Sequence, residues 1–215
     1  MAKPKLKVVP KATGGRPAKI SRERILHEAR QLAVGDLSLP RIAERLRVQP
    51  PALYYHFKSR DELLNELASM LAQEFTIETG NPKRWRQWLE ETALRLYDFL
   101  QTNPAVFNVD NWRLIVAMGE PILESVLTTL EAAGYSVEDA GRIWEAIGNM
   151  TYTEARLLSE LRRAGPSLAA LVAEQKAKPL PPRTAAWVKT VNADPRQQFI
   201  ETLHWIVTAL PKPGK

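Results

Sequence analysis

Apolar residues recur every three or four positions along the chain after its first twenty residues, which is the period of an amphipathic α-helix. The spacing predicts helices that begin after Ser21 and Ser38, a short one from Pro51 to near Phe57, and a fourth after Ser59. Serine is a typical N-cap, and proline fits the first helical turn because its missing N–H has no helical partner there. No segment alternates apolar and polar residues like a strand, so the expected fold class is all-α.

The helical period continues to the C-terminus and is interrupted only near glycine and proline. Further helices are predicted over residues 85–100, 115–133, 136 to about 165, 168–178 and 199–210. The proline-rich stretch 179–184, PLPPRT, is predicted to be a loop.

Charge divides the chain in a way that the hydrophobic pattern does not. The net charge of +6 is the balance of +8 over residues 1–64 and −2 over residues 65–215. A basic N-terminal module joined to a near-neutral one is typical of polyanion binding, although a basic tail that only aids solubility would give the same asymmetry. Residues 1–19 show no helical or strand period and are expected to form a flexible basic arm.

Composition narrows the class of protein further. Hydrophobic residues make up 45% of the chain, enough for a buried core, and cysteine is absent. No apolar run approaches the roughly 18 residues of a membrane helix, and no secretory signal is present, so a cytoplasmic protein without a membrane partner is expected. The patterns GxSxG and HExxH and a phosphate-binding loop are all missing, which argues against an enzyme. No cofactor and no metal site are predicted.

The segment 38–57 has the pattern helix, tight turn, short helix, which is typical of a helix-turn-helix that places its second helix in the DNA major groove. A more specific string follows. LYYHFKSRDELL at 53–64, after IAERL at 42–46, resembles the TetR family of bacterial transcriptional repressors. The passage 127–140 is similar, more faintly, to the tetracycline-repressor branch of that family.

The resemblance implies an N-terminal three-helix DNA-binding domain over 20–66 and a larger helical domain for effector binding and dimerisation over 67–215. It implies a ligand-responsive repressor that binds double-stranded DNA, at a palindromic operator, as a homodimer and is released by a small-molecule effector. The alternative is an architectural protein that binds DNA with little sequence preference and has no effector.

The resemblance also implies how contacts with DNA are divided. Phosphate contacts fall to Tyr54, Tyr55, His56 and Lys58, and base edges face the leading end of the recognition helix. One tyrosine is expected in the core, since adjacent helical residues face about 100° apart. Leu53 and Phe57 are expected to pack inward. The expected DNA contacts are Arg16, Lys19, Ser38, Arg41, Gln49, Pro50, Pro51, Ala52, Tyr54, Tyr55, His56 and Lys58.

Two departures from the family pattern affect this expectation. Arg47 stands where the family usually has glycine, so a positive φ there would cost on the order of 1 kcal/mol. The leading end of the recognition helix offers few side-chain hydrogen bonds, and Gln49 is its one amide. The Gly-Arg-Pro of the arm, around Arg16, resembles segments that enter the A·T-rich minor groove, although nonspecific phosphate contacts are an equal alternative.

The second domain is expected to hold an aromatic-lined pocket for an apolar effector. Candidate lining residues are Trp85, Trp88, Phe107, Trp112, Met118, Trp144 and Tyr152, each of which could equally be core. Candidate interface or core residues, between which the pattern cannot choose, are Ile143, Ile147, Met150, Phe199, Leu203, Ile206 and Leu210. Tetracycline itself is disfavoured as the effector, because no histidine falls in 108–115, where a drug-bound magnesium would need one.

Overall fold

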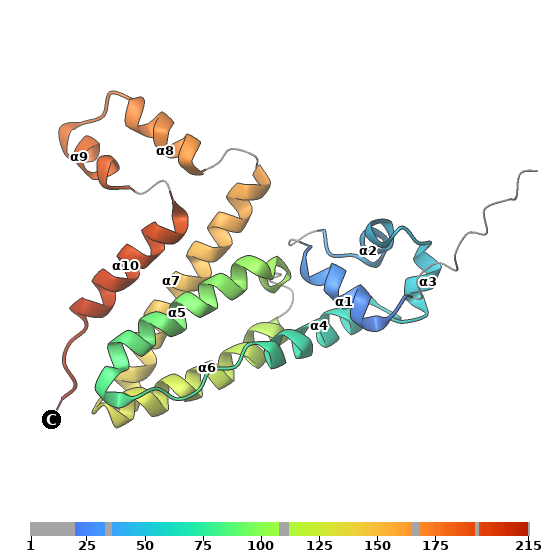
Figure 1. Cartoon of the computed structure of the whole chain (residues 1–215), viewed down its shortest axis with the longest axis horizontal. Coiled ribbons are helices and arrows are strands. Elements are labelled where there is room, and N and C mark those ends of the chain that lie inside the picture. The colour runs from blue at the N-terminus through green and yellow to red at the C-terminus, as the bar shows by residue number, and fades with distance from the viewer. Residues whose placement is uncertain (1–19, 33–35, 108–111, 165–167, 192–193, 215) are drawn as a thin grey trace, which may run out of the picture.

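The structure is a computed structural model that describes residues 20–32, 36–107, 112–164, 168–191 and 194–214. Every regular element in these residues is helical, which confirms the expected all-α fold class. Figure 1 shows a group of short helices at one end, a bundle of long helices at the other, and α4 running from the first into the second. Within the same residues, no helix combines the length and the apolarity needed to span a lipid bilayer.

The N-terminal part, called the headpiece below, contains α1 (Arg22–Arg30), α2 (Leu39–Leu46), α3 (Pro50–Tyr54) and the start of α4 (Arg60–Glu74). Ser38 and Ser59 cap α2 and α4 as predicted, and Ser21 caps α1 in the same way: each side-chain oxygen accepts a hydrogen bond from the backbone N–H three residues later. Apolar residues from all four helices close one core, and the completely buried ones are Ile25, Ala29, Ile42, Ala43, Leu53, Phe57, Leu63 and Leu67.

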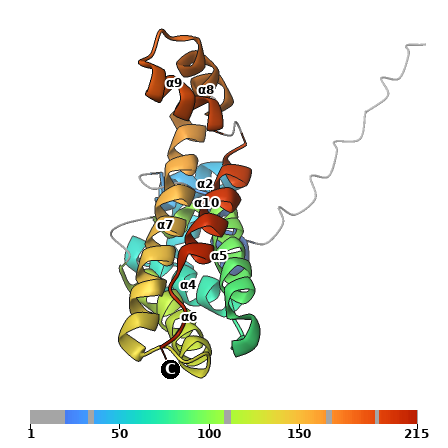
Figure 2. The same ribbon diagram turned by 90° about the vertical axis from the view of Figure 1, so that its left-hand side faces the viewer.

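The remaining helices form what is called the body below. They are the short 3-10 helices η1 (Pro82–Arg84) and η2 (Pro104–Phe107) and the α-helices α5 (Trp85–Thr102), α6 (Trp112–Ala132), α7 (Val137–Ala164), α8 (Leu168–Ala177), α9 (Pro182–Thr190) and α10 (Pro195–Ala209). α5 packs along α7, and α10 lies against both. Figure 2 shows α8 and α9 at one end of α7, beyond the rest of the bundle.

Several predicted limits differ from the structure, among them the start of α10, which begins at Pro195, earlier than 199. α3 ends at Tyr54, before Phe57, and α6 begins at Trp112, earlier than 115. The predicted loop 179–184 is wrong in its second half, because α9 begins at Pro182. Consecutive prolines suggest a break in sequence, yet a proline at the start of a helix loses no hydrogen bond and already has a helical φ.

Burial decides between interface and core for four of the seven candidates named above. Ile143, Ile147, Phe199 and Leu203 are at most 7% exposed within the single chain, so they form its own core and are not available to a partner. The ring of Phe199 stacks on Tyr97 of α5 at 4.4 Å between centroids, which fixes α10 to the bundle. The other three, Met150, Ile206 and Leu210, are half-buried. Hydrophobic periodicity marks an apolar face but does not tell which neighbour covers it.

α4 connects the headpiece to the body without a break. Its first turns belong to the headpiece core, and its later residues pack along α6. The ring of Phe75, which ends α4, lies 4.8 Å from that of Phe99 in α5. The boundary expected between residues 66 and 67 therefore falls inside a continuous helix, and the domain limits stay a prediction.

Candidate DNA interface and ligand cavity

The turn between α2 and α3 is tight and uses a left-handed residue. Arg47 adopts φ 56° and ψ 45°, and its N–H donates to the carbonyl of Glu44 at 3.0 Å. The N–H of Val48 then reaches back to the carbonyl of Ala43 at 2.9 Å, which closes the end of α2. The positive φ anticipated for this position is therefore present, and it is carried by a residue with a side chain.

The recognition helix α3 divides its residues sharply between core and surface. Leu53 and Phe57 are completely buried, as predicted from their spacing. Tyr54 is 49% exposed and Tyr55 is 88% exposed, so the expectation that one of them is core is wrong. Leu53 and Phe57 already fill the space under α3, because the chain leaves the helix after Tyr54. Both tyrosines are therefore free to reach a partner outside the molecule.

The other expected DNA contacts surround this exposed surface. Gln49 precedes α3 and is exposed, and its amide makes no capping bond. Pro51 is exposed, whereas Pro50 and Ala52 are half-buried. The Ser38 hydroxyl caps α2, and Arg41 pairs with Glu44 in an exposed ion pair of little energetic weight. Arg16 and Lys19 lie outside the described residues.

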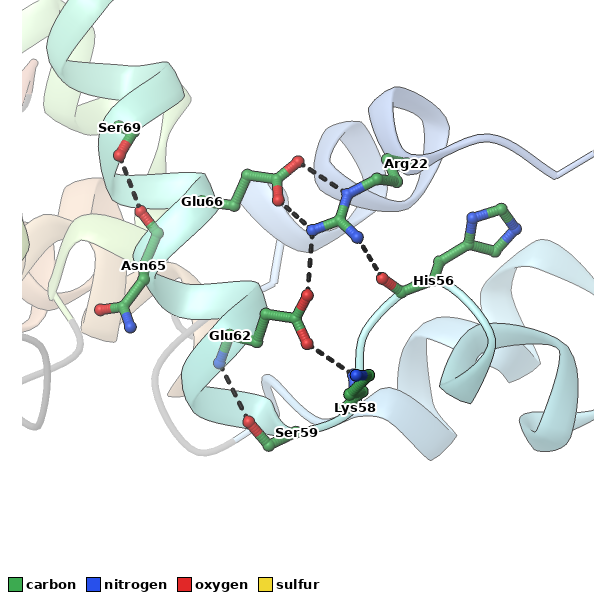
Figure 3. Close-up of polar contacts among 8 residues, drawn as sticks. All are labelled: Arg22, His56, Lys58, Ser59, Glu62, Asn65, Glu66 and Ser69. Atoms are coloured by element: carbon green, nitrogen blue, oxygen red, sulfur yellow. Dashed lines mark hydrogen bonds and ion pairs between the residues drawn. The ribbon is translucent and has the colours of Figure 1, made fainter.

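Arg22 holds the segment that follows α3, and sequence patterns gave no sign of this role. Figure 3 shows its guanidinium between Glu62 and Glu66 of α4 and the carbonyl of His56. The Nε donates to Glu66 at 3.0 Å, one terminal nitrogen lies 3.2 Å from Glu62, and the group sits 4.2 Å from the centre of the Phe57 ring. A single side chain of α1 thus fixes both α4 and the end of the recognition unit.

Glu62 completes this network from the other side. Its second oxygen accepts the backbone N–H of Lys58 at 2.8 Å, and its own N–H donates to Ser59 at 3.1 Å. The backbone N–H of Lys58, followed by Arg22, lowers the pKa of the Glu62 carboxyl. These bonds use only backbone groups of His56 and Lys58, so the imidazole and the ammonium remain available for phosphate (Figure 3).

The body contains a cavity of about 430 Å³ between α5, α6 and α7. Met118, Trp144 and Tyr152 line it, as expected, together with residues that sequence did not single out: Leu96, Leu100, Val106, Gly119, Ile122, Glu145, Gly148 and Asn149. The walls are mainly apolar, with one carboxylate and one amide. Gly119 leaves part of this space open, because a Cβ added there would meet no atom within 4 Å.

The other expected pocket residues have different surroundings. Trp85 is buried edge-to-face against Tyr135, with ring centroids 5.2 Å apart. The indole N–H of Trp88 donates to the carbonyl of Glu78 at 3.3 Å. Neither lines the cavity, which corrects the prediction: both lie in the first turn of α5, whereas the cavity lies beside its second half. The ring of Phe107 packs against that of Tyr152, which lines the cavity. The side chain of Trp112 lies outside the described part of the structure.

Arg30, the last residue of α1, joins the headpiece to the wall of the cavity. Its Nε donates to Asn103 Oδ1 at 2.7 Å, and its terminal nitrogens bind both oxygens of Glu74 at 3.0 and 2.7 Å. Asn103 is completely buried and ends α5; its carbonyl accepts the N–H of Val106, which lines the cavity. This three-way contact, called the Arg30 clamp below, links the ends of α1, α4 and α5.

The outer face of α10 exposes mainly polar side chains, with the indole of Trp205 among them. Trp205 is 73% exposed and borders a shallow hollow with His204 and Thr208. At the edge of this face, the Nδ1 of His204 lies 2.9 Å from a carboxylate oxygen of Glu90. No group of histidine, aspartate and glutamate side chains suited to a metal ion occurs among the residues that could be placed.

Comparison with known proteins follows this division into two parts. The model of the bacterial regulatory proteins of the tetR family matches residues 25–67, from α1 into α4. Over these residues the chain is similar to the bacterial regulatory proteins of that family. The helix-turn-helix and the string 53–64 lie inside the matched segment, which confirms the resemblance seen in the sequence.

Curated relatives and solved structures extend the likeness beyond the matched segment. The HTH-type transcriptional repressor Rv1353c of Mycobacterium tuberculosis is 25% identical over 154 residues, which are 65% of this chain and 58% of that protein. The tetracycline repressor protein class E of Escherichia coli is 30% identical over 122 residues, 54% of this chain and 56% of that one. This chain thus spans less than two thirds of the length of either relative.

Among solved structures, the TetR family protein ActR of Streptomyces coelicolor in complex with actinorhodin is similar with a TM-score of 0.57. The match covers 89% of this chain and 98% of that chain at 21% identity. At this identity the likeness establishes the fold, an N-terminal helix-turn-helix followed by a helical C-terminal part.

Proposed function

We propose that this chain is a ligand-responsive transcriptional repressor that binds a palindromic operator as a homodimer and is released by a small apolar or aromatic effector. The observation that carries the proposal is the Arg30 clamp, through which the helix-turn-helix and the cavity of one chain share a buried polar contact. A protein that only coated DNA would need neither the cavity nor the link.

The exposed surface of α3 supports a division of labour in DNA binding. Gln49 stands before the helix with a free amide, where it can reach base edges. Tyr54, Tyr55, His56 and Lys58 offer hydroxyl, imidazole and ammonium groups suited to phosphates. We therefore expect Gln49→Ala to change the preferred sequence, and His56→Ala to weaken binding to all duplexes alike.

The decisive experiment is a selection of bound duplexes from a random-sequence library, followed by affinity measurements for the parent chain and both variants. A palindromic consensus that only Gln49→Ala alters supports the repressor. Sequence-blind, salt-sensitive binding by the parent chain would instead support the architectural alternative.

The cavity supports an effector with an aromatic body and a polar edge. Trp144 and Tyr152 offer ring faces, while Glu145 and Asn149 offer hydrogen-bonding groups at the same wall. ActR, which shares the fold, has been solved with actinorhodin bound. We expect a thermal-shift screen of aromatic compounds to give ligands that stabilise the parent chain.

Gly119→Leu serves as the control for this screen, because its side chain would occupy the open part of the cavity. The variant should lose the ligand-induced shift while its fold and its DNA binding persist. A shift that survives in Gly119→Leu would place the ligand elsewhere.

Release from DNA requires that the effector binds the released state more tightly than the DNA-bound state. Val106 lines the cavity, its N–H is bonded to Asn103, and Asn103 accepts from Arg30 at the end of α1. A ligand that displaces this wall would change the position of α1 and α4, and hence the spacing of the two recognition helices in a dimer.

The dimer is needed because one recognition helix reads too few base pairs, and two half-sites one helical turn apart call for two-fold symmetry. The exposed indole of Trp205 on α10, with the shallow hollow beside it, offers an apolar anchor for that contact. Trp205 joins the half-buried candidates Met150, Ile206 and Leu210 as a residue that a partner could cover.

A further inference from the structure

Arg47 is the one described residue other than glycine with a positive φ. A side chain with a Cβ is strained in the left-handed region, whereas glycine adopts it freely. The position itself needs this conformation, because the N–H groups of Arg47 and Val48 must turn back to close α2. A glycine would therefore make a more stable turn than the arginine that is present.

The charge of Arg47 is also available for a partner outside the chain. Its side chain is exposed, and no hydrogen bond or ion pair engages its guanidinium within the described residues. The neighbouring arginines differ: Arg41 is paired with Glu44, and Arg45 donates to Glu28 at 2.9 Å. A strained residue in the turn thus carries an uncommitted positive charge.

The leading end of α3 lacks the donors that such a charge would supply. Pro50 and Pro51 have no backbone N–H, and Ala52 has no polar side-chain atom. Lys58 provides an exposed cation beyond the other end of α3. Arg47 and Lys58 therefore bracket the recognition helix, one before it and one after it, as two phosphates bracket the groove that the helix enters.

We propose that Arg47 contacts a DNA phosphate at the N-terminal side of α3 and, with Lys58, sets the position of the recognition helix on the duplex. This role deepens the proposed function and rests on it, since it requires that α3 binds DNA. It is independent of the effector cavity and of the dimer contact.

The test compares Arg47→Gly, Arg47→Asn and Arg47→Lys with the parent chain. Arg47→Gly should raise the melting temperature by about 2–4 °C, because it relieves the left-handed strain. The same change should weaken DNA binding roughly 3- to 10-fold on all duplexes and reduce the salt dependence by about 0.9 per lost phosphate contact. A purely structural residue would not change stability and DNA affinity in opposite directions.

The two other variants separate charge from backbone. Asparagine tolerates the left-handed region but is neutral, so Arg47→Asn should bind DNA as weakly as Arg47→Gly. Arg47→Lys keeps the charge and should retain most of the affinity and the parent salt dependence. Lys83→Ala removes a cation from η1, beside the start of α5 and far from α3 in Figure 1. This variant should change neither the DNA affinity nor its salt dependence.

Affinities are measured by fluorescence anisotropy at several salt concentrations, on a duplex selected by the parent chain and on an unrelated one. Equal affinities and salt dependences for the parent, Arg47→Gly and Arg47→Asn would overturn the role of Arg47. A parent chain that binds no duplex would contradict the proposed function itself and remove this proposal with it. The two failures are therefore distinguishable.

Discussion

The headpiece and the body are both helical, yet they differ in how completely each closes on itself. In the headpiece, four helices bury Leu53 and Phe57 fully, and serine caps the N-termini of α1, α2 and α4. Arg22 of α1 binds both α4 and the backbone that follows α3. In the body, longer helices leave a cavity of about 430 Å³ and a tryptophan that is 73% exposed.

This difference indicates where the headpiece and the body can each bind a partner. The headpiece presents exposed polar groups around α3, which suit contact with a partner at its surface. The body has a cavity inside and an exposed tryptophan outside, which suit a small molecule and a second chain. The Arg30 clamp is the polar contact through which a change in one part would reach the other.

The largest expected effect comes from breaking the closed core of the headpiece. Phe57→Ala removes a completely buried ring that also lies under the Arg22 guanidinium, and should cost about 3–5 kcal/mol of unfolding free energy. Denaturant unfolding followed by circular dichroism measures this loss. Tyr55→Ala, at a side chain that is 88% exposed, should leave stability unchanged and weaken only DNA binding. Equal destabilisation by both variants would contradict the division of α3 into core and surface.

A smaller effect is expected at the outer face of the body. Trp205→Ala should weaken self-association by about 2–4 kcal/mol, since exposed aromatic anchors carry much of the energy of an interface. Sedimentation velocity over a range of concentrations would follow the shift toward monomer. Trp187 of α9 is also exposed, at 66%, and is the matched control. Dissociation by Trp187→Ala in place of Trp205→Ala would move the interface to α8 and α9.

Breaking the connection between the headpiece and the body is expected to have a smaller effect still. Arg30→Met leaves the buried Asn103 Oδ1 without its donor and should cost about 1–3 kcal/mol of stability. Arg30→Met should also reduce the effect of an identified effector on DNA affinity.

Arg95→Met serves as the control, because Arg95 donates to the carbonyl of Thr76, lies 6.0 Å from the centre of the Phe75 ring, and is not among the residues that line the cavity. Unchanged coupling in the Arg30 variant, measured as the ratio of DNA affinities with and without effector, would show that the clamp is structural only.

The smallest expected effect is a pH dependence that belongs to the headpiece. The backbone N–H of Lys58 and the Arg22 guanidinium lower the pKa of Glu62, so its stabilising charge is present above its unfolded pKa of about 4.3 and is lost as pH falls through the lower folded value. Glu62→Gln should weaken the fall of the melting temperature as the pH drops below about 4.3. Glu124→Gln in α6 is the control, and an equal weakening there would mean that general charge repulsion dominates.

The sequence by itself determined the helices, their serine caps and the buried pair Leu53 and Phe57, because these depend on residues three or four positions apart. It also placed the helix-turn-helix and the positive φ at Arg47, since a tight turn constrains few residues. The start of α9 at Pro182 was missed, because proline marks a helix start and a loop alike.

Only the tertiary structure decided which neighbouring element covers each apolar face. It placed Ile147 and Leu203 in the core of the single chain and left the large apolar side chain of Trp205 outside. It brought Arg22 to Glu66 and Arg30 to Asn103, pairs separated by 44 and 73 residues that no local pattern connects. It also set the cavity, whose space depends on the absence of side chains at Gly119 and on the packing of three helices around it. Local spacing encodes elements, whereas contacts between distant elements are fixed only when the whole chain packs.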